Sequence, residues 1–413
     1  MIIFFEWSQN MDILIEIYHR LLKETVPLYR RKFYDDFQMD SRFVGVIGAR
    51  GVGKTTFLVN YLRDNYLNSQ QALYISADNL YFVEHNLFGT VDRFVKEFNG
   101  QIICIDEIHR YKDWEQELKN IYDSFPRLSV IFSGSSSINL AHGKTDLSRR
   151  LVLKTMYGFS FREFLEVQTH KSYPLLTFDN LIGDYYRYAQ NFAQTPKLLG
   201  YLKEYLKQGY YPTFLELKSY ESYQNTLQNI VDKVIYEDIS SFYSLHTSNL
   251  ETLKKIIYFF ATSQPGSINI NRLAQNLKKD HTTIAEYIQI LKDTGLLRFL
   301  LKNKQGYALV RDAEKIFLDN TNLLYALNRE IGKEPPTGLM REMFIVCTLQ
   351  NAGYFVFSKE SADIESGGYY FEIGGKNKTS AFIQKSRKGY IIKDDILIGD
   401  KKNIPLYLFG FLS

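Results

Sequence analysis

The sequence contains only two cysteines, Cys104 and Cys347, among 413 residues. Two cysteines cannot build a disulfide framework, and their separation matches no metal-ligand spacing. This scarcity excludes a cystine-stapled secreted domain and a zinc site made of cysteines. We therefore expect a protein of a reducing compartment, namely the cytoplasm.

Long apolar runs are also missing, because no segment reaches the roughly 20 residues of a membrane-spanning helix. The first residues, MIIFFEW, are apolar but few, and no small-residue cleavage site follows them, so we expect neither a signal peptide nor a membrane partner. The net charge of +4 is small for this length and neither demands nor excludes nucleic acid. A chain of this length exceeds one core, and about two to four domains are expected.

The stretch GARGVGKTT satisfies the phosphate-loop pattern G-x-x-x-x-G-K-[ST] through Gly48, Gly53, Lys54 and Thr55. An apolar run precedes it and a helical pattern follows it, which is the strand-loop-helix setting that the motif requires. Backbone N–H groups of such a loop surround the β-phosphate, the lysine reaches the β- and γ-phosphates, and the threonine hydroxyl binds Mg²⁺. The predicted ATP-binding residues are Gly48, Ala49, Arg50, Gly51, Val52, Gly53, Lys54, Thr55 and Thr56.

A pair of acidic residues, Asp106 and Glu107, ends the apolar run of residues 102–105. An Asx-type turn at a strand end would explain such a pair without any chemistry. Next to a phosphate loop, however, Asp106 would hold Mg²⁺ through its water shell, and Glu107 would orient and deprotonate the attacking water. The second carboxylate therefore favours ATP hydrolysis over nucleotide binding alone.

Two further groups of polar residues are candidates for catalysis. Ser133 and Ser135 end the fourth apolar run, and either would contact the γ-phosphate or its attacking water if that strand lies between the strands of the loop and the acid pair. A serine-rich turn is the alternative. Arg149 and Arg150 enter the fifth run, where an arginine finger supplied by a neighbouring subunit, and hence a homo-oligomer, competes with a solvated strand start.

The periodicity of apolar residues divides the chain into segments. Residues 1–41 form a helical lead-in, and residues 42–160 alternate strands with helices, which predicts a mostly parallel sheet with ligand at the carboxyl ends of its strands. A helical period follows over residues 161–245. The pattern from 246 to 330 includes two short helices and an apolar strand, which is typical of a winged helix-turn-helix that serves either as a spacer or as a DNA reader.

The tail, residues 331–413, combines a helix with strands rich in tyrosine and phenylalanine. Asp363, Glu372 and Lys376, with Glu342 as a helper, could bind a metal and activate water against a phosphodiester. This tentative second metal site would make the tail a nuclease.

Three stretches together resemble a known family. GARGVGKTT, IDEIHRYKDWEQELKNIYDSFPRLSVIFSGSSS and LSRR followed by GFSFREFLE are similar to the prokaryotic AAA-type ATPases with a C-terminal domain of unknown function that resembles restriction endonucleases in fold. The tail stretches FEIGGKNK and PLYLFGFL match that group too. The resemblance implies an α/β fold with a P-loop parallel-sheet ATPase core, a helical lid, a winged-helix module and a small α+β nuclease-like tail.

The resemblance extends to the site residues, with departures. Lys54 and Thr55 match the phosphate-loop positions, Asp106 and Glu107 the metal and water positions, and a serine in 133–135 the sensor. The family often has Gly-Gly before Tyr-Pro, where this chain has GYYP at 209–212. A working nuclease of this fold has Glu-x-Lys on one strand, whereas Gly374 stands two residues after Glu372.

The sequence therefore predicts an Mg²⁺-dependent ATP-hydrolysing molecular switch whose C-terminal modules bind an unidentified protein partner. The alternative is an ATP-regulated DNA-binding protein or nuclease. Because the catalytic lysine position is a glycine, we expect no efficient DNA cleavage.

Overall fold

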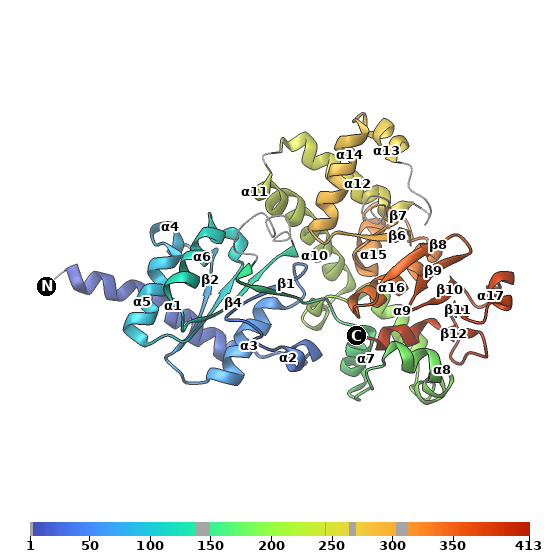
Figure 1. Cartoon of the computed structure of the whole chain (residues 1–413), viewed down its shortest axis with the longest axis horizontal. Coiled ribbons are helices and arrows are strands. Elements are labelled where there is room, and N and C mark those ends of the chain that lie inside the picture. The colour runs from blue at the N-terminus through green and yellow to red at the C-terminus, as the bar shows by residue number, and fades with distance from the viewer. Residues whose placement is uncertain (1–2, 137–148, 244, 264–269, 303–312) are drawn as a thin grey trace. The chain divides into compact units, whose positions relative to one another are not determined.

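Five short strands form a parallel sheet in the first part of the chain (Figure 1). The computed structural model describes residues 3–136, 149–243, 245–263, 270–302 and 313–413. The strands of this sheet are β1 (Phe43–Ile47), β2 (Ala72–Ser76), β3 (Ile102–Asp106), β4 (Ser129–Gly134) and β5 (Val152–Thr155). Their order is β2-β3-β4-β1-β5, and every neighbouring pair is parallel. All five coincide with predicted apolar runs, and β4 lies between β1 and β3 as the sensor hypothesis requires.

Helices connect and accompany these strands. They are α1 (Ile3–Glu24), α2 (Lys32–Asp36), α3 (Lys54–Tyr66), α4 (Tyr81–Glu84), α5 (Leu87–Phe98), the 3₁₀ turn η1 (Ile108–Arg110) and α6 (Trp114–Ser124). Trp114, Leu118 and Ile121 of α6 are buried and form its core-facing side. Because all five strands run in one direction, their carboxyl ends meet at one edge of the sheet, where ligands bind in folds of this kind.

The described chain divides into two compact units, Met1–Tyr157 and Gly158–Ser413. The second unit begins with a series of helices. They are α7 (Phe161–Thr169), α8 (Phe178–Phe192), α9 (Leu198–Gln208), η4 (Pro212–Leu215), α10 (Tyr220–Lys233), the π-helical turn η5 (Val234–Ile239), α11 (Ser240–Phe242) and α12 (Thr247–Thr262). This run agrees with the helical period expected from residue 161 onward.

A seven-stranded mixed sheet organises the rest of the second unit. Its strands are β6 (Leu297–Lys302), β7 (Ala313–Leu318), β8 (Val356–Lys359), β9 (Ala362–Ser366), β10 (Tyr369–Gly374), β11 (Gly389–Lys393) and β12 (Asn403–Pro405). The accompanying helices are α13 (Ile270–Leu277), α14 (His281–Asp293), α15 (Thr321–Glu330), α16 (Thr337–Asn351), α17 (Ala381–Lys385) and η7 (Leu406–Phe411).

The segments predicted as a winged helix and as a tail share this sheet. The antiparallel pair β6–β7 follows α13 and α14, as a winged helix requires, but β6 also pairs in parallel with β8 of the tail. The sheet order is β12-β11-β10-β9-β8-β6-β7, so hydrogen bonds run across the boundary expected at residue 330. The three segments predicted after residue 160 therefore lie within one compact unit.

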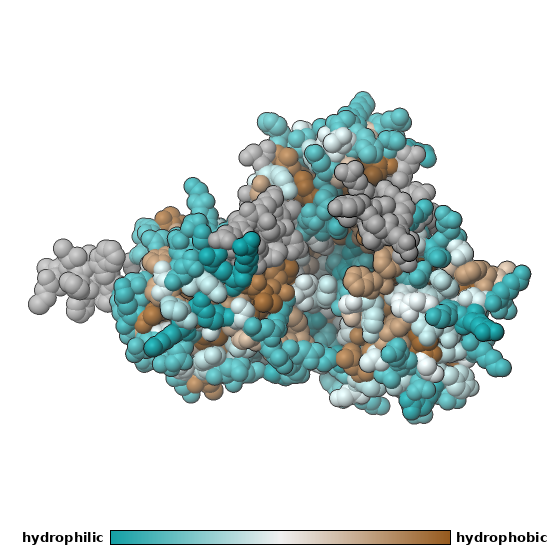
Figure 2. Space-filling view, in the orientation of Figure 1, coloured by the Kyte–Doolittle hydropathy of each residue, from teal (hydrophilic) through white to brown (hydrophobic). Residues whose placement is uncertain are grey.

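The molecular surface seen in Figure 2 is largely polar. Hydrophilic residues, teal in Figure 2, cover much of it, and apolar residues appear in small patches, as is normal for folded proteins. Within the part of the chain that the structure describes, no helix is both long enough and apolar enough to cross a membrane.

Candidate nucleotide-binding site

The loop between β1 and α3 has the predicted strand-loop-helix setting. Gly51 and Gly53 adopt left-handed backbone conformations, with φ of 81° and 98°, which glycine adopts without steric cost. A side chain at Gly48 would place its Cβ 2.2 Å from the Met156 carbonyl oxygen. Helix α3 begins at Lys54, so the positive end of its dipole lies at the loop.

Lys54 is buried at the start of α3, with its ammonium group close to the loop backbone. Its Nζ donates hydrogen bonds to the carbonyl oxygens of Gly48 at 2.9 Å and Ala49 at 3.0 Å. The side chain therefore folds back toward the loop that precedes it. This direction is the one that a lysine needs in order to contact phosphates held by that loop.

Asp106 receives hydrogen bonds from three hydroxyl groups at the carboxyl end of β3. Its Oδ2 accepts from Thr55 at 2.5 Å and from Tyr74 at 2.8 Å, and its Oδ1 accepts from Ser133. Asp106 is only 2% exposed, whereas Thr55 is exposed to solvent. The fold therefore brings together the two predicted Mg²⁺-binding groups, the Asp106 carboxylate and the Thr55 hydroxyl, which are 51 positions apart in the sequence.

These oxygen groups fit Mg²⁺, a hard cation that keeps several water ligands and commonly takes one or two carboxylates plus phosphate oxygens. Thr55 and Asp106 would hold it. Among the described residues, no cluster of three or more His, Cys, Asp or Glu side chains is arranged to hold a metal ion by itself. A Mg²⁺ ion held by Thr55 and Asp106 would take its remaining ligands from water and phosphate oxygens.

Tyr74 is a site residue that the sequence interpretation missed. It lies on β2 beside β3, and both its burial and the nearby charge of Asp106 raise the pKa of its phenol. The hydroxyl therefore stays protonated and donates to the carboxylate. A tyrosine inside an apolar strand was the available signal, because a buried phenol needs a hydrogen-bond partner.

Glu107 follows Asp106 in a left-handed conformation, with φ of 51° and ψ of 38°. Such a backbone conformation is uncommon for a non-glycine residue and clusters at functional sites. Its N–H lies 3.1 Å from Asp106 Oδ1 and 3.2 Å from Ser133 Oγ. The Asp106 contact thus reaches the next residue, whereas an Asx turn bonds the backbone two residues on. Its carboxylate oxygen Oε2 lies 3.5 Å from Nε2 of the buried His109.

The two candidate serines are both buried. Ser133 is 0% exposed, and its hydroxyl contacts both the Asp106 carboxylate and the Glu107 N–H. Ser135 comes directly after β4 and is 3% exposed. Ser133 therefore joins the two acidic residues, which is a contact that neither the sensor hypothesis nor the turn hypothesis predicted.

Comparison with known families addresses the same part of the chain. Residues 40–165 match the family model of the AAA domain. The match supports an ATP-binding P-loop ATPase of the AAA type. A second model, a domain of unknown function, matches residues 199–335.

Similar proteins have been found in an archaeon and a bacterium. The uncharacterized protein MJ1637 of Methanocaldococcus jannaschii is 25% identical over 93% of this chain and 85% of its own length. An uncharacterized protein of Haemophilus influenzae is 23% identical over 70% of this chain and 71% of its own.

Solved structures give weaker similarities. AMPPCP-bound DnaA from Aquifex aeolicus aligns with 67% of this chain and 86% of its own at 17% identity and a TM-score of 0.27. C. elegans PCH-2 aligns with 67% of this chain and 68% of its own at 11% identity and a TM-score of 0.24. Scores this low do not establish a shared fold across the aligned residues.

Arg149 and Arg150 precede β5, at the amino ends of the strands of the first sheet. Arg149 is exposed, and the Arg150 guanidinium lies 5.8 Å from the ring centroid of Tyr122, with its Nε 3.3 Å from Asp123 Oδ1. Tyr122 also packs against Phe43, the first residue of β1. Since the phosphate loop leaves the opposite end of β1, an arginine finger here would have to act on another copy of the chain.

The tail acids lie together, but with a different lysine from the predicted one. Lys378 Nζ is 2.7 Å from Glu372 Oε2 and 4.0 Å from Asp363 Oδ2, whereas Lys376 is exposed to solvent. The prediction of Lys376 was wrong because the chain turns back after β10. The Lys378 N–H donates to the Gly375 carbonyl, and the Lys378 side chain packs closely over Gly374.

Each carboxylate of this tail cluster has a cationic or hydrogen-bonding partner. Lys315 Nζ lies 2.7 Å from Glu342 Oε2, and Asp363 Oδ2 accepts a hydrogen bond from the Ile373 N–H at 2.7 Å. Burial raises the pKa of Glu342, and the charge of Lys315 offsets only part of this rise. Burial lowers the pKa of Lys378, but the hydrogen bond with Glu372 and the charges of nearby acids outweigh it and raise that pKa overall. The tail acids are therefore arranged as partners of lysines.

Proposed function

We propose that the chain binds ATP with Mg²⁺ and hydrolyses it at the site formed by the phosphate loop and the acid pair. The contact between the Thr55 hydroxyl and the Asp106 carboxylate carries this proposal, because it joins the two predicted metal-binding groups at the end of the loop. The AAA-domain match over residues 40–165 supports the same conclusion.

Each residue has a distinct role in the proposed reaction. The loop N–H groups and Lys54 bind and orient the phosphates, and bound Mg²⁺ would neutralise charge on the phosphate oxygens. Thr55 and Asp106 would hold that ion. Glu107 accepts a proton from the attacking water, and the oxygen of that water forms a bond to the γ-phosphorus as the bond to the β-phosphate oxygen breaks.

We further propose that hydrolysis drives a molecular switch in which residues 158–413 present a surface to a protein partner. The division of the chain into an ATP-binding unit and a second compact unit supports this role. The DNA-binding or nuclease alternative is ranked second, because Gly374 occupies the position where a working nuclease of this fold has lysine. Lys378 Nζ lies 2.7 Å from Glu372 Oε2 and would be the lysine of such a site.

Replacing Glu107 by Gln tests hydrolysis directly. The amide keeps the size of the side chain but cannot accept the proton, so we expect ATP binding to persist while turnover falls about 100-fold or more. Binding is measured by calorimetry and turnover by phosphate release. Glu97→Gln provides a matched control, since Glu97 is an exposed residue of α5 that pairs only at the surface with Arg93.

Lys54→Ala tests nucleotide binding separately. The variant loses a charge-assisted contact with the phosphates of about 1.5–3 kcal/mol, so most of the ATP affinity should disappear. Undiminished ATP binding by Lys54→Ala would overturn the assignment of the loop. Wild-type turnover by Glu107→Gln would instead leave the acid pair as a structural turn.

A further inference from the structure

Arg31 is a buried arginine in the lead-in, placed immediately before α2. Only 6% of the residue is exposed, and its Nη1 lies 3.2 Å from the Val52 carbonyl oxygen and 2.8 Å from the Tyr157 carbonyl oxygen. Val52 belongs to the phosphate loop and Tyr157 is the last residue of the first unit. One guanidinium thus joins the lead-in, the loop and the end of the AAA domain.

The same end of the AAA domain supports the other side of the loop. The Met156 N–H donates to the Ile47 carbonyl at 2.7 Å, just before the loop begins. The Met156 carbonyl lies so close to Gly48 that a Cβ there would be 2.2 Å away. Residues 156–157 therefore support the phosphate loop at two points. Met156 packs directly against Gly48, and Tyr157 is linked to Val52 through the Arg31 guanidinium.

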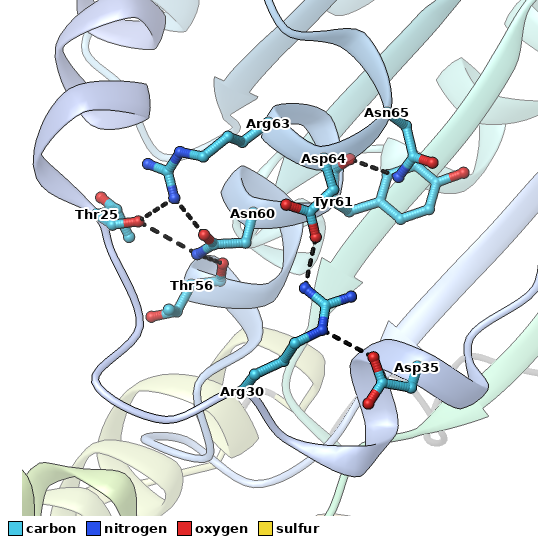
Figure 3. Close-up of polar contacts among 9 residues, drawn as sticks. All are labelled: Thr25, Arg30, Asp35, Thr56, Asn60, Tyr61, Arg63, Asp64 and Asn65. Carbon is cyan, nitrogen blue, oxygen red and sulfur yellow. Dashed lines mark hydrogen bonds and ion pairs between the residues drawn. The ribbon is translucent and has the colours of Figure 1, made fainter.

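The segment that carries Arg31 is itself attached to α3 (Figure 3). The Thr25 carbonyl accepts hydrogen bonds from Asn60 Nδ2 at 3.2 Å and from Arg63 Nη1 at 2.9 Å. Arg30 Nη1 also lies 2.6 Å from Asp64 Oδ2, but this ion pair is exposed and contributes little to the attachment. Because α3 begins at the last residues of the loop, the lead-in is held in place relative to the loop that Arg31 contacts.

We propose that Arg31 is a positioning residue of the nucleotide site, which holds the phosphate loop in the shape that binds phosphates. This inference rests on the proposed ATP binding. Val52 lies between Gly51 and Gly53, and glycine restricts the backbone dihedral angles little, so the backbone here can adopt many conformations. A hydrogen bond from a buried guanidinium restricts it, and a preorganised loop binds its ligand more tightly because less ordering is required on binding.

The test measures nucleotide affinity and stability together in three variants. Arg31→Gln removes the guanidinium. Arg31→Lys keeps the charge, but its shorter side chain does not reach the position from which Nη1 contacts both carbonyls. Arg30→Gln is the matched control. Arg30 is the neighbouring residue, and its side chain is 50% exposed with ion pairs only to Asp35 and Asp64. The dissociation constant for ATP is measured by calorimetry and the melting temperature by differential scanning fluorimetry.

We expect the dissociation constant to rise about tenfold or more for Arg31→Gln and about threefold or more for Arg31→Lys, with turnover at saturating ATP much less affected. Arg30→Gln should stay within about twofold of wild type, since exposed ion pairs contribute little. A purely structural role for Arg31 would lower the melting temperature while the folded protein kept its wild-type dissociation constant, and that result would overturn the proposal.

Two other outcomes are distinguishable. If Arg31→Gln does not fold, Arg31→Lys decides the question, and a wild-type dissociation constant in that variant rejects the positioning role. If the wild-type chain itself binds no ATP, the proposed function fails rather than the role of Arg31. If the wild type binds ATP and Lys54→Ala does not, ATP binds at the phosphate loop. The effect of the Arg31 variants on that loop can then be measured.

Discussion

Replacing Ser133 by Ala separates two roles for this serine. As a sensor it would contact the γ-phosphate or the attacking water, and its loss would lower the rate of turnover at any Mg²⁺ concentration. The structure instead places its hydroxyl between the Asp106 carboxylate and the Glu107 N–H. From these contacts we predict that Ser133→Ala weakens the apparent affinity for Mg²⁺.

The size of the effect follows from the chemistry of the contact. Ser133 is fully buried and donates to an ionised carboxylate that is itself 2% exposed. A hydrogen bond to a charged group contributes about 1.5–3 kcal/mol, and about 1.4 kcal/mol corresponds to a factor of ten. If this energy serves to orient Asp106 for the metal, the midpoint for Mg²⁺ rises by about tenfold and by at most roughly 150-fold.

The assay is ATP turnover measured across a range of Mg²⁺ concentrations, with Ser135→Ala measured beside it. We expect Ser133→Ala to recover much of the wild-type rate at high Mg²⁺, because the other donors to Asp106, Thr55 and Tyr74, remain. An unchanged Mg²⁺ midpoint with a reduced maximal rate would refute the positioning role and favour the sensor hypothesis. An equal shift in Ser135→Ala would show that the effect is not specific to the Asp106 contact.

Three further predictions concern the tail, assembly and alkaline stability. Supercoiled plasmid incubated with the protein and Mg²⁺ or Mn²⁺ should not be nicked, and nicking that an Asp363→Ala/Glu372→Ala variant lacks would contradict this. If Arg149 or Arg150 acts in a neighbouring copy, specific ATPase activity should rise with protein concentration, and a constant rate that survives alanine at both positions would exclude it. Burial raises the pKa of Tyr211 and other tyrosines above their ordinary value of 10.0, so the folded state retains protons that the unfolded state releases. Stability should therefore be complete below pH 10.0 and fall as pH rises further, which urea unfolding at pH 8.5 and 10.5 would detect; equal midpoints would argue against it.

The sequence alone determined the features of the site that depend on neighbouring residues. Five apolar runs predicted the five strands of the first sheet, because short β-branched runs bounded by turn residues favour strands. The spacing within residues 48–55 predicted the loop, since its glycines and lysine act within one turn of backbone. Asp106 and Glu107 were recognisable because they stand together at a strand end.

The tertiary structure decided which residues support that site and how the rest of the chain is organised. Lys378 replaces Lys376 beside the tail acids because a turn reverses the chain after Gly374. The tail and the preceding hairpin form one sheet because β6 pairs with β8, a contact that strand periodicity does not specify.

The residues that support the nucleotide site also depend on the tertiary structure, because they contact groups far away in the sequence. The hydroxyl of Tyr74 meets a carboxylate 32 positions away, and the guanidinium of Arg31 meets a carbonyl 126 positions away. No local pattern encodes such contacts, because each hydrogen bond exists only once separate strands and loops have packed together. The phosphate loop and its acid pair are therefore recognisable from short sequence motifs. The residues that orient them can be identified only from the tertiary structure.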